Sequence, residues 1–349
     1  EDIFGQAYEH LLERFADSAG KSAGEFFTPR EVVRLLVELL EPENRDKICD
    51  PTCGSGGMLI WAAKFIEEKG GDPKNLELHG QERNYGNYGM CRMNIILHGV
   101  KGTKIEHADV LKNPLLLDKS GDLLKYDKVI ANYPFSQNWN EKDYASKDSW
   151  NRFKFGIPSK IKRADFAFIQ HMYSILNDKG KAAIISSQGA LYRGKTEFEI
   201  RKELVLKDHI ECIIALPSNL FYATGIPACI IMLNKNKPEK RKGKIMFMYA
   251  AKDYEELTKR DKLRDSDIKK IKTSINSFKN IDKYCHIADL AEIEENGFNL
   301  NVPRYVDVSE PEIPIDIQEA YDELKKSYSE QNKLKQKVES NLKELNIKL

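Results

Sequence analysis

The segment ICDPTCGSGGML, residues 48–59, decides the fold. An apolar strand ends at Asp50, a glycine-rich turn follows, and a helix is predicted to begin near Gly57. Gly54, Gly56 and Gly57 permit positive φ and let a ligand approach the backbone amides at a helix N-terminus. The dinucleotide pattern G-x-G-x-x-G is not met, because a leucine stands where the third glycine would be. The segment indicates a ligand-binding turn, although a purely structural tight turn has the same composition.

Short apolar runs alternate with helical stretches on both sides of this turn. The expected strands are Lys47–Asp50, Leu76–Glu82, Lys104–Asp109, Tyr126–Asn132, Lys181–Ser187, Ile210–Leu216 and Ala228–Asn234. A helix is expected over 29–40, where Thr28 is typical of an N-cap and Pro29 of a first helical residue. The alternation predicts an α/β fold, a doubly wound, mostly parallel, Rossmann-like sheet of seven strands.

The two ends of the chain differ from this central pattern. Residues 1–20 are expected to be the end of a helical region, and residues 21–250 to form the main domain. Residues 251–310 are expected to be a charged helical and irregular extension. Residues 311–349 are expected to be a helical arm, because their apolar residues recur at coiled-coil-like spacing. The chain has no initiating methionine and opens with an apolar helical stripe, so we expect it to begin inside a longer protein.

Composition limits the class of protein. Of 349 residues, 41% are hydrophobic and 31% charged, which is typical of a cytosolic globular protein. The net charge is +1, so any nucleic-acid contact needs a local basic patch. The six cysteines form no C-x-x-C, which predicts reduced, buried thiols in a cytoplasmic setting and no metal site. No apolar run approaches the eighteen or so residues of a membrane span, so no membrane partner is expected.

Acidic residues end successive strands around the glycine turn. Glu82 ends the second predicted strand, where a carboxylate is placed to accept both hydroxyls of a ribose. Asp109 ends the third, where it can accept a hydrogen bond from the exocyclic amine of an adenine. A single acid of this kind is more often a helix N-cap. Together with Asp50, the acids indicate an adenosine-containing cofactor.

The stretch IANYPFSQ, residues 130–137, follows the fourth predicted strand. Asn132, Tyr133, Pro134 and Phe135 place an amide and two aromatic rings at the strand's carboxyl end, the edge at which open α/β sheets bind ligands. A turn that uses Asn and Pro for local reasons is the alternative.

These motifs carry a resemblance to a known family. Asp-Pro-x-x-Gly-x-Gly-Gly followed by Asn-x-Pro-Phe resembles the S-adenosylmethionine-dependent N6-adenine DNA methyltransferases. GEFFTPREVVRLL just upstream narrows the resemblance to the modification subunit of type I restriction–modification systems, over residues 1 to about 310. The resemblance implies S-adenosyl-L-methionine as cofactor, with Asp50 near its methionine end and Asp109 near its adenine. The implied cofactor contacts are Glu25, Phe26, Phe27, Thr28, Pro29, Arg30, Asp50, Gly54, Ser55, Gly56, Glu82 and Asp109.

The resemblance also gives residues 132–135 a catalytic role. The Asn132 side-chain oxygen and the Tyr133 carbonyl would each accept one N6–H of adenine, which aims the nitrogen lone pair outward. The family usually has proline where this chain has Tyr133, but the required carbonyl is retained. Pro134 completes the turn, and Phe135 would stack on a base rotated out of the duplex. The methyl group would then transfer in line, promoted chiefly by proximity and orientation.

Partners and alternatives follow from the same resemblance. The expected partners are DNA, a specificity subunit, a restriction endonuclease subunit and a second copy of the modification subunit, with the C-terminal arm as a subunit contact. One alternative is a related methyltransferase that acts on protein glutamine or RNA. Another is a catalytically silent assembly subunit. The aromatic and basic insert at 138–163 is expected either to contact an extruded base and its phosphates or to pack inward as a lid. Arg193 and Lys195 are further candidates for phosphate contacts.

Overall fold

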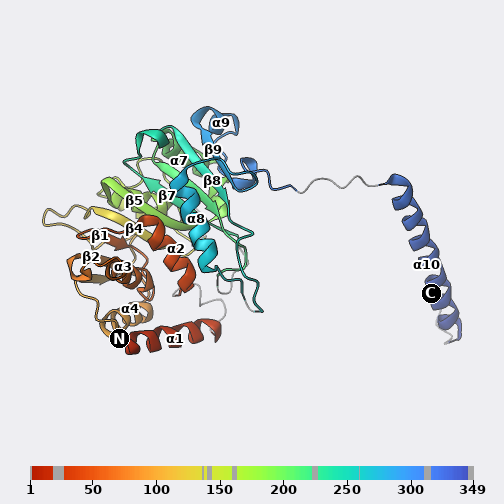
Figure 1. Cartoon of the computed structure of the whole chain (residues 1–349), viewed down its shortest axis with the longest axis horizontal. Coiled ribbons are helices and arrows are strands. Elements are labelled where there is room, and N and C mark those ends of the chain that lie inside the picture. Colours follow the sequence, from red (N-terminus) through yellow and green to blue (C-terminus); the bar gives the residue numbers. More distant parts are fainter. Residues whose placement is uncertain are drawn as a thin grey trace. The chain divides into compact units, whose positions relative to one another are not determined.

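The computed structural model describes residues 2–18, 27–135, 137–139, 144–158, 163–221, 227–258, 260–309 and 316–344. The chain divides into two compact units, Glu1–Val308 and Ser309–Leu349 (Figure 1). The first unit contains the sheet, and the second contains the helix α10 (Ile317–Glu344). Among the described residues, no helix has both the length and the apolar character needed to cross a membrane.

A single mixed sheet forms the centre of the first unit. Within the described residues it has nine strands in the order β3-β2-β1-β4-β5-β7-β6-β8-β9. The strands are β1 (Lys47–Asp50), β2 (Glu77–Glu82), β3 (Thr103–His107), β4 (Tyr126–Asn132), β5 (Leu176–Ser187), β6 (Ile210–Ala215), β7 (Ala228–Asn234), β8 (Lys244–Tyr249) and β9 (Cys285–Asp289). The pairs from β3 to β5 are parallel, β7 runs antiparallel to both of its neighbours, and β9 is antiparallel to β8.

The predicted fold class and all seven predicted strands are confirmed, with changes at their ends. The third strand ends at His107, so Asp109 follows it rather than ending it. The fifth strand begins at Leu176 and not at Lys181, because Leu176 already pairs with Tyr126 of β4, next to an irregularity in register. The prediction missed β8 and β9. The edge strand β9 is only partly buried and therefore lacks a continuous apolar run.

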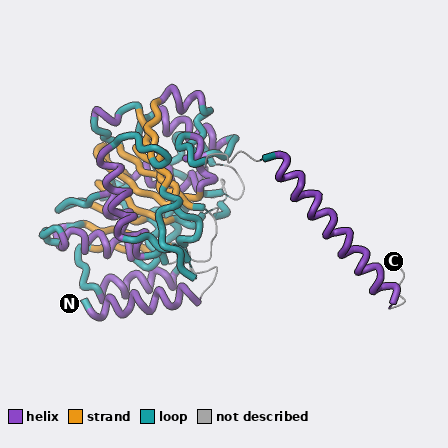
Figure 2. Tube along the Cα trace, turned by 45° about the vertical axis from the view of Figure 1, so that its right-hand side comes forward, coloured by secondary structure: helices purple, strands orange, loops and turns teal. Residues whose placement is uncertain are grey.

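Helices cover both faces of this sheet (Figure 2). Their bounds are α1 (Ile3–Ser18), α2 (Arg30–Leu40), α3 (Gly57–Glu68), α4 (Tyr85–Leu97), α6 (Asp165–Ile175), α7 (Thr196–Leu206), α8 (Asp265–Ser277) and α9 (Leu290–Glu295). Short 3-10 turns lie at Pro73–Asn75, Ala145–Lys147, Gln188–Leu191, Glu239–Arg241 and Val302–Arg304. One apolar core joins the sheet to α6, α7 and α9, and the other joins it to α2, α3, α4 and α8. Helices α2 and α8 lie side by side over the second core (Figure 1).

Strand residues alternate between the two cores. In β4, Val129 and Ala131 belong to the first core and Ile130 to the second. In β6, Ile213 faces the first core and Cys212 the second. Successive side chains of a strand point to opposite faces, so a strand that is covered on both faces needs a continuous apolar run. This requirement explains why the central strands were easy to predict.

The sheet changes winding direction between β1 and β4. These strands are parallel neighbours, with Cys49 opposite Val129. From β1 the sheet continues to β2 and β3 on one side, and from β4 to β5 on the other. Asp50 and Asn132 therefore end adjacent strands at the point of reversal, where open α/β sheets have a crevice for a ligand.

Candidate active site

The glycine turn has the backbone geometry that its sequence predicted. Gly54 has φ of 51° and Gly56 has φ of 79°, and α3 begins at Gly57 as expected. The Gly56 amide donates to the Cys53 carbonyl at 2.7 Å. A Cβ atom at Gly56 would lie 2.8 Å from the sulfur of Cys91 on α4. Positive φ and close packing both require glycine at position 56.

Glu82, at the end of β2, stabilises this turn by hydrogen bonding. Its Oε2 accepts from the Gly54 amide at 3.0 Å, and its Oε1 accepts from the Asn84 amide at 2.7 Å. Burial raises the pKa of the Glu82 carboxyl, and these amide hydrogen bonds oppose that rise. The carboxylate thus connects the segments that follow β1 and β2 within the protein itself.

Asp109 lies two residues beyond β3 and is also bonded within the protein. Its Oδ1 accepts from the Leu111 amide at 3.0 Å. Its Oδ2 accepts from the Tyr144 hydroxyl at 3.2 Å. Tyr144 belongs to the insert at 138–163, so part of this insert lies against the candidate cofactor site.

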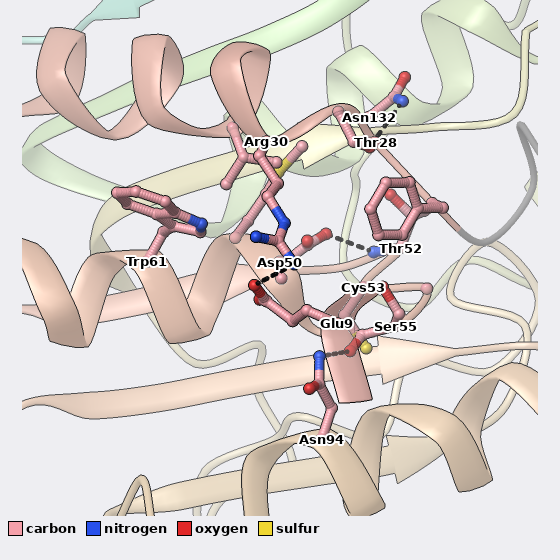
Figure 3. A pocket seen from close by; sticks show the side chains of 15 residues that line it. Glu9, Thr28, Arg30, Asp50, Thr52, Cys53, Ser55, Trp61, Asn94 and Asn132 are labelled. Atoms are coloured by element: carbon pink, nitrogen blue, oxygen red, sulfur yellow. Dashed lines mark hydrogen bonds and ion pairs between the residues drawn. The ribbon is translucent and has the colours of Figure 1, made fainter. Parts of the chain in front are cut away.

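Asn132 is oriented by the start of α2. Its Nδ2 donates to the Thr28 hydroxyl at 3.0 Å, shown as a dashed line in Figure 3. Since the amide nitrogen is engaged, the side-chain oxygen is the end that is available to a substrate. The same bond explains a difference at α2. The helix begins at Arg30 with Pro29 as its N-cap, one residue later than predicted. The Thr28 hydroxyl accepts from Asn132 and does not cap the helix.

Tyr133 anchors the turn that follows Asn132. Its side chain is buried, and its hydroxyl lies 2.6 Å from the Ser186 hydroxyl on β5. Its ring stacks on Phe168 of α6 at a centroid distance of 5.1 Å. Phe135 is half-buried and meets Tyr133 edge to face at 5.8 Å and Phe221 at 6.4 Å. The tyrosine thus occupies a core position between β5 and α6.

Two pockets meet at Asn132. The Arg30 pocket, drawn in Figure 3, is lined by residues of the glycine turn together with Phe27, Thr28, Arg30, Asp50 and others. The Glu82 pocket has a volume of about 270 Å³ and is lined by Glu82, Asp109, Pro134 and Phe168 among others. Both pockets include Thr52 and Asn132 in their walls. The two pockets together form an extended site across the carboxyl ends of β1, β2 and β4.

Asp50 is almost completely enclosed in the wall of the Arg30 pocket. Its side chain is 2% exposed, and its Oδ1 accepts from the Thr52 amide at 3.0 Å. Burial raises the pKa of the Asp50 carboxyl to about 8, and the nearby charge of Glu82 adds to the rise. A cation placed in this pocket would favour the ionised carboxylate.

The pockets bring together most of the residues that the sequence predicted. The predicted residues in their walls are Phe27, Thr28, Arg30, Asp50, Gly54, Ser55, Glu82, Asp109, Asn132 and Pro134. Glu25 and Phe26 lie outside the described residues. Glu9, Trp61, Asn94 and Phe168 also line the pockets but were not predicted. Trp61 lies on α3 just beyond the glycine-turn motif, whereas the other three belong to helices with no recognised motif, so only the folded structure places them in the site.

The described part of the 138–163 insert packs largely inward. Trp139, Phe153 and Phe155 are buried in the first core. The buried Arg152 side chain pairs with Asp148 at 2.5 Å and donates to backbone carbonyls at 2.7 and 2.9 Å. These residues hold the insert against the protein, as the inward-packing alternative predicted.

Arg193 is likewise committed within the protein. Its guanidinium pairs with Asp165 and with Glu197, each at 2.6 Å. Both acids are buried, so this network stabilises the start of α7, and the phosphate contact at Arg193 stays a prediction. Lys195, also a candidate, has φ of 60° immediately before α7.

The chain belongs to the N-6 DNA Methylase family, whose sequence model matches residues 1–312. The curated relatives are more specific. The chain is 39% identical to the type I restriction enzyme MjaVIII methylase subunit of Methanocaldococcus jannaschii, over 99% of this chain and 60% of the relative. It is 37% identical to the HindI methylase subunit of Haemophilus influenzae, over 89% of this chain and 70% of the relative. The predicted resemblance to type I modification subunits is confirmed.

A solved structure supports the same relationship. The crystal structure of the type I restriction–modification methyltransferase subunit from Streptococcus thermophilus is 34% identical, with a TM-score of 0.79. The match covers 88% of this chain and 64% of that chain. This chain spans about three fifths of the length of the first curated relative.

Proposed function

We propose that this chain transfers a methyl group from S-adenosyl-L-methionine to N6 of adenine in DNA, as the catalytic part of a type I modification subunit. The observation that carries the proposal is the position of Asn132. Thr28 holds its amide nitrogen, so its oxygen is available as an acceptor where the two pockets meet. Family membership and the names of the relatives support the same reaction class.

The residues present fit this cofactor. In our proposal the Glu82 pocket holds the adenosine part, and the Arg30 pocket holds the methionine part. Buried donors of Arg30 and a buried acceptor of Asn94 have no hydrogen-bond partner, which suits the charged amino-acid group. The enclosed Asp50 carboxyl suits a neighbouring cation. When bound, S-adenosylmethionine would supply an electrophilic methyl group.

The acceptors at the end of β4 would activate the substrate amine. An exocyclic adenine amine is a poor nucleophile, because its lone pair is delocalised into the ring. The Asn132 oxygen and the Tyr133 carbonyl would each accept one N6–H, so the lone pair points outward. The nitrogen becomes acidic as it gains the methyl group, and its proton can then leave to water without a strong base. Preorganised acceptors of this kind are the main electrostatic contribution in many enzymes.

The adenine must leave the duplex to reach this site. In our proposal Phe135 stacks on the extruded base. Its ring is half-buried and makes edge contacts with two aromatic neighbours, which would hold its plane in a defined orientation. Pro134 lines the Glu82 pocket next to it and keeps the turn compact.

We also propose the partners that the resemblance implies: a specificity subunit, an endonuclease subunit and a second copy of the modification subunit, acting in the cytoplasm. In this scheme residues 21–250 form the methyltransferase domain and 251–310 its extension. Residues 311–349 then form the arm for subunit contact. The arm's helix, α10, exposes apolar side chains at coiled-coil-like spacing, namely Ile317, Tyr321, Leu324, Tyr328, Leu334 and Val338. We assign this face to the specificity subunit.

Transfer of tritium from labelled S-adenosylmethionine to DNA tests the activity, with and without the proposed specificity subunit. We expect label in N6-methyladenine when both subunits are present. Label in RNA or in protein glutamine would reassign the substrate. Cofactor binding without transfer to any of these acceptors would support the catalytically silent alternative.

Removal of Ile317–Leu349 tests the proposed arm. We expect the truncated chain to bind S-adenosylhomocysteine normally but to elute without the specificity subunit on a sizing column. Unchanged complex formation would exclude α10 as the docking element.

A further inference from the structure

Several buried polar atoms that line the Arg30 pocket have no hydrogen-bond partner. Arg30 Nε and Nη2 have no hydrogen-bond partner, and neither has Asn94 Oδ1. Asn94 is 1% exposed, and its Nδ2 donates to the Ser55 carbonyl at 3.0 Å, so only its oxygen is left unbonded (Figure 3). Buried polar atoms in native proteins are nearly always bonded to protein or water. Their concentration here indicates that the pocket is built for a ligand with polar groups of its own.

The Glu9 side chain of α1 also lines the Arg30 pocket. This side chain is buried. Its Oε2 lies 3.4 Å from Arg30 Nη2, and its Oε1 lies 3.6 Å from His98 Nε2. Figure 3 shows the Glu9 carboxylate pointing toward the Arg30 guanidinium from the side of the glycine turn. The first of these contacts is an ion pair without a hydrogen bond, so a ligand could separate the two groups at little cost.

The position of Glu9 is fixed by the packing of its helix. Helix α1 lies against α4, and its Leu12 and Ala16 form a small buried cluster with Phe27. The His98 ring at the end of α4 also pairs with Asp2 at the start of α1. Contacts at two points along α1 therefore hold the Glu9 carboxylate at the pocket wall.

We propose that Glu9 is a cofactor-binding residue that accepts hydrogen bonds from the α-ammonium group of the methionine part, while Arg30 binds the α-carboxylate. The proposal rests on the proposed function, because it names the ligand of that site. The ammonium and carboxylate of an amino acid are attached to the same carbon, so they need an acid and a base side by side. Glu9 and Arg30 are such a pair, and charge-assisted hydrogen bonds to both would be among the strong ones.

Cofactor binding would also stabilise the position of α1. A ligand that bridges Glu9 of α1 and Arg30 of α2 holds α1 in place against the main domain. Binding and the seating of α1 then stabilise each other, since any ligand that binds one arrangement preferentially shifts the equilibrium toward it. Asp50 is the rival acceptor for the ammonium group, because it lines the same pocket.

Measuring two ligands, with and without the ammonium group, against several protein variants distinguishes Glu9 from Asp50 as the ammonium acceptor. Calorimetric titration of the full chain would use S-adenosylhomocysteine and its deaminated analogue, which keeps the carboxylate. We expect the unaltered protein to bind S-adenosylhomocysteine about 10-fold more tightly than the analogue. Glu9→Gln should bind both with the same affinity. Glu13→Gln, one turn further along α1 and paired with Arg260 at 3.7 Å, is the matched control and should keep the full preference.

Each outcome bears on a different claim. A Glu9→Gln protein that keeps the 10-fold preference overturns the inference, assigns the ammonium to Asp50, and leaves the proposed function standing. An equal loss for both ligands also overturns it, because Glu9 would then serve only the packing of α1. Failure of the unaltered protein to bind either ligand removes the proposed function together with the inference. If Glu9→Gln fails to fold, Glu9→Asp retains the charge and should lose part of the preference.

Discussion

The Glu82 pocket and the Arg30 pocket differ in how their polar groups are bonded. In the Glu82 pocket, the carboxylates of Glu82 and Asp109 already accept hydrogen bonds from backbone amides. In the Arg30 pocket, buried atoms of Arg30 and Asn94 have no hydrogen-bond partner. The carboxylates of the Glu82 pocket are thus bonded within the protein, whereas Arg30 and Asn94 keep hydrogen-bonding capacity that a ligand could use.

This difference separates stability from affinity. A buried group that bonds to the protein contributes to folding, and its loss leaves other groups unsatisfied. A buried group without a hydrogen-bond partner carries an uncompensated desolvation cost, so its removal does not lower stability, and its hydrogen bonds form when a ligand binds. Substitutions in the Glu82 pocket should therefore lower stability and affinity together. Substitutions in the Arg30 pocket should lower affinity alone.

The largest effect is expected at Asn132, where the two pockets meet. Asn132→Ala removes the acceptor for N6–H but leaves the glycine turn, Glu82 and Arg30 in place. Methyl transfer by the assembled complex should fall by about 10²–10³-fold, the usual cost of losing one preorganised transition-state hydrogen bond. Affinity for S-adenosylhomocysteine should change only a few-fold. Calorimetry beside a methyl-transfer assay measures the two quantities.

The exposed Asn75, before β2, gives a matched control for this substitution. Asn75→Ala should leave transfer and binding unchanged. Near-normal transfer by a well-folded Asn132→Ala protein would refute the catalytic assignment. Parallel losses of stability and cofactor affinity would make Asn132 a structural turn residue.

The next largest effect is expected at Arg30, whose buried donors make no hydrogen bond in the protein. Arg30→Gln removes donors that make no hydrogen bond in the protein and one partly exposed ion pair, to Glu9 at 3.4 Å, so the free energy of unfolding should change by no more than about 1 kcal/mol. Affinity for S-adenosylhomocysteine should fall about 10- to 100-fold, because hydrogen bonds to a charged group are lost. Arg34→Gln is the control one turn along α2, where the arginine pairs with Glu38 and Asp265 outside the pocket. A large drop in stability for Arg30→Gln would show that Arg30 also has a structural role.

Substitution of Glu82, whose carboxylate is bonded to backbone amides, should lower both stability and affinity. Glu82→Gln keeps one acceptor oxygen but turns an amide donor toward a backbone N–H of Gly54 or Asn84. The free energy of unfolding should fall by about 1–3 kcal/mol, and cofactor affinity should fall with it. Chemical denaturation measures the first and calorimetry the second. Glu77→Gln, at the exposed start of the same strand, should change neither. Full stability in Glu82→Gln would remove the distinction between the two pockets.

Residues that lie in a local sequence pattern could be predicted, and residues that reach the site only through tertiary packing could not. Asp50, Glu82 and Asn132 were found because strand ends and glycine turns leave a local pattern, and the fold follows from apolar runs of strands covered on both faces. Glu9 and Asn94 left no such pattern. They reach the pocket only through the packing of α1 and α4, which joins segments far apart in the chain. The ion pairs of Arg193 with Asp165 and Glu197 were missed for a related reason, since charge alone does not reveal a buried acidic partner.

The smallest effect is a pH dependence at Asp50, which lines the Arg30 pocket and whose pKa is affected by the charge of Glu82. Because burial and the charge of Glu82 raise the pKa of Asp50 to about 8, its carboxyl is mostly protonated at pH 7 in the free protein. A bound cation favours the carboxylate, so binding lowers this pKa and releases a proton below pH 8. Affinity for S-adenosylmethionine should therefore rise by up to about 10-fold per pH unit as pH approaches 8, and level off above it. Calorimetry at pH 7 in phosphate and in Tris, whose ionisation enthalpies differ, counts the protons released. Asp50→Asn should abolish the release and flatten the pH profile, whereas release that persists in this variant would place the titrating group elsewhere in the site.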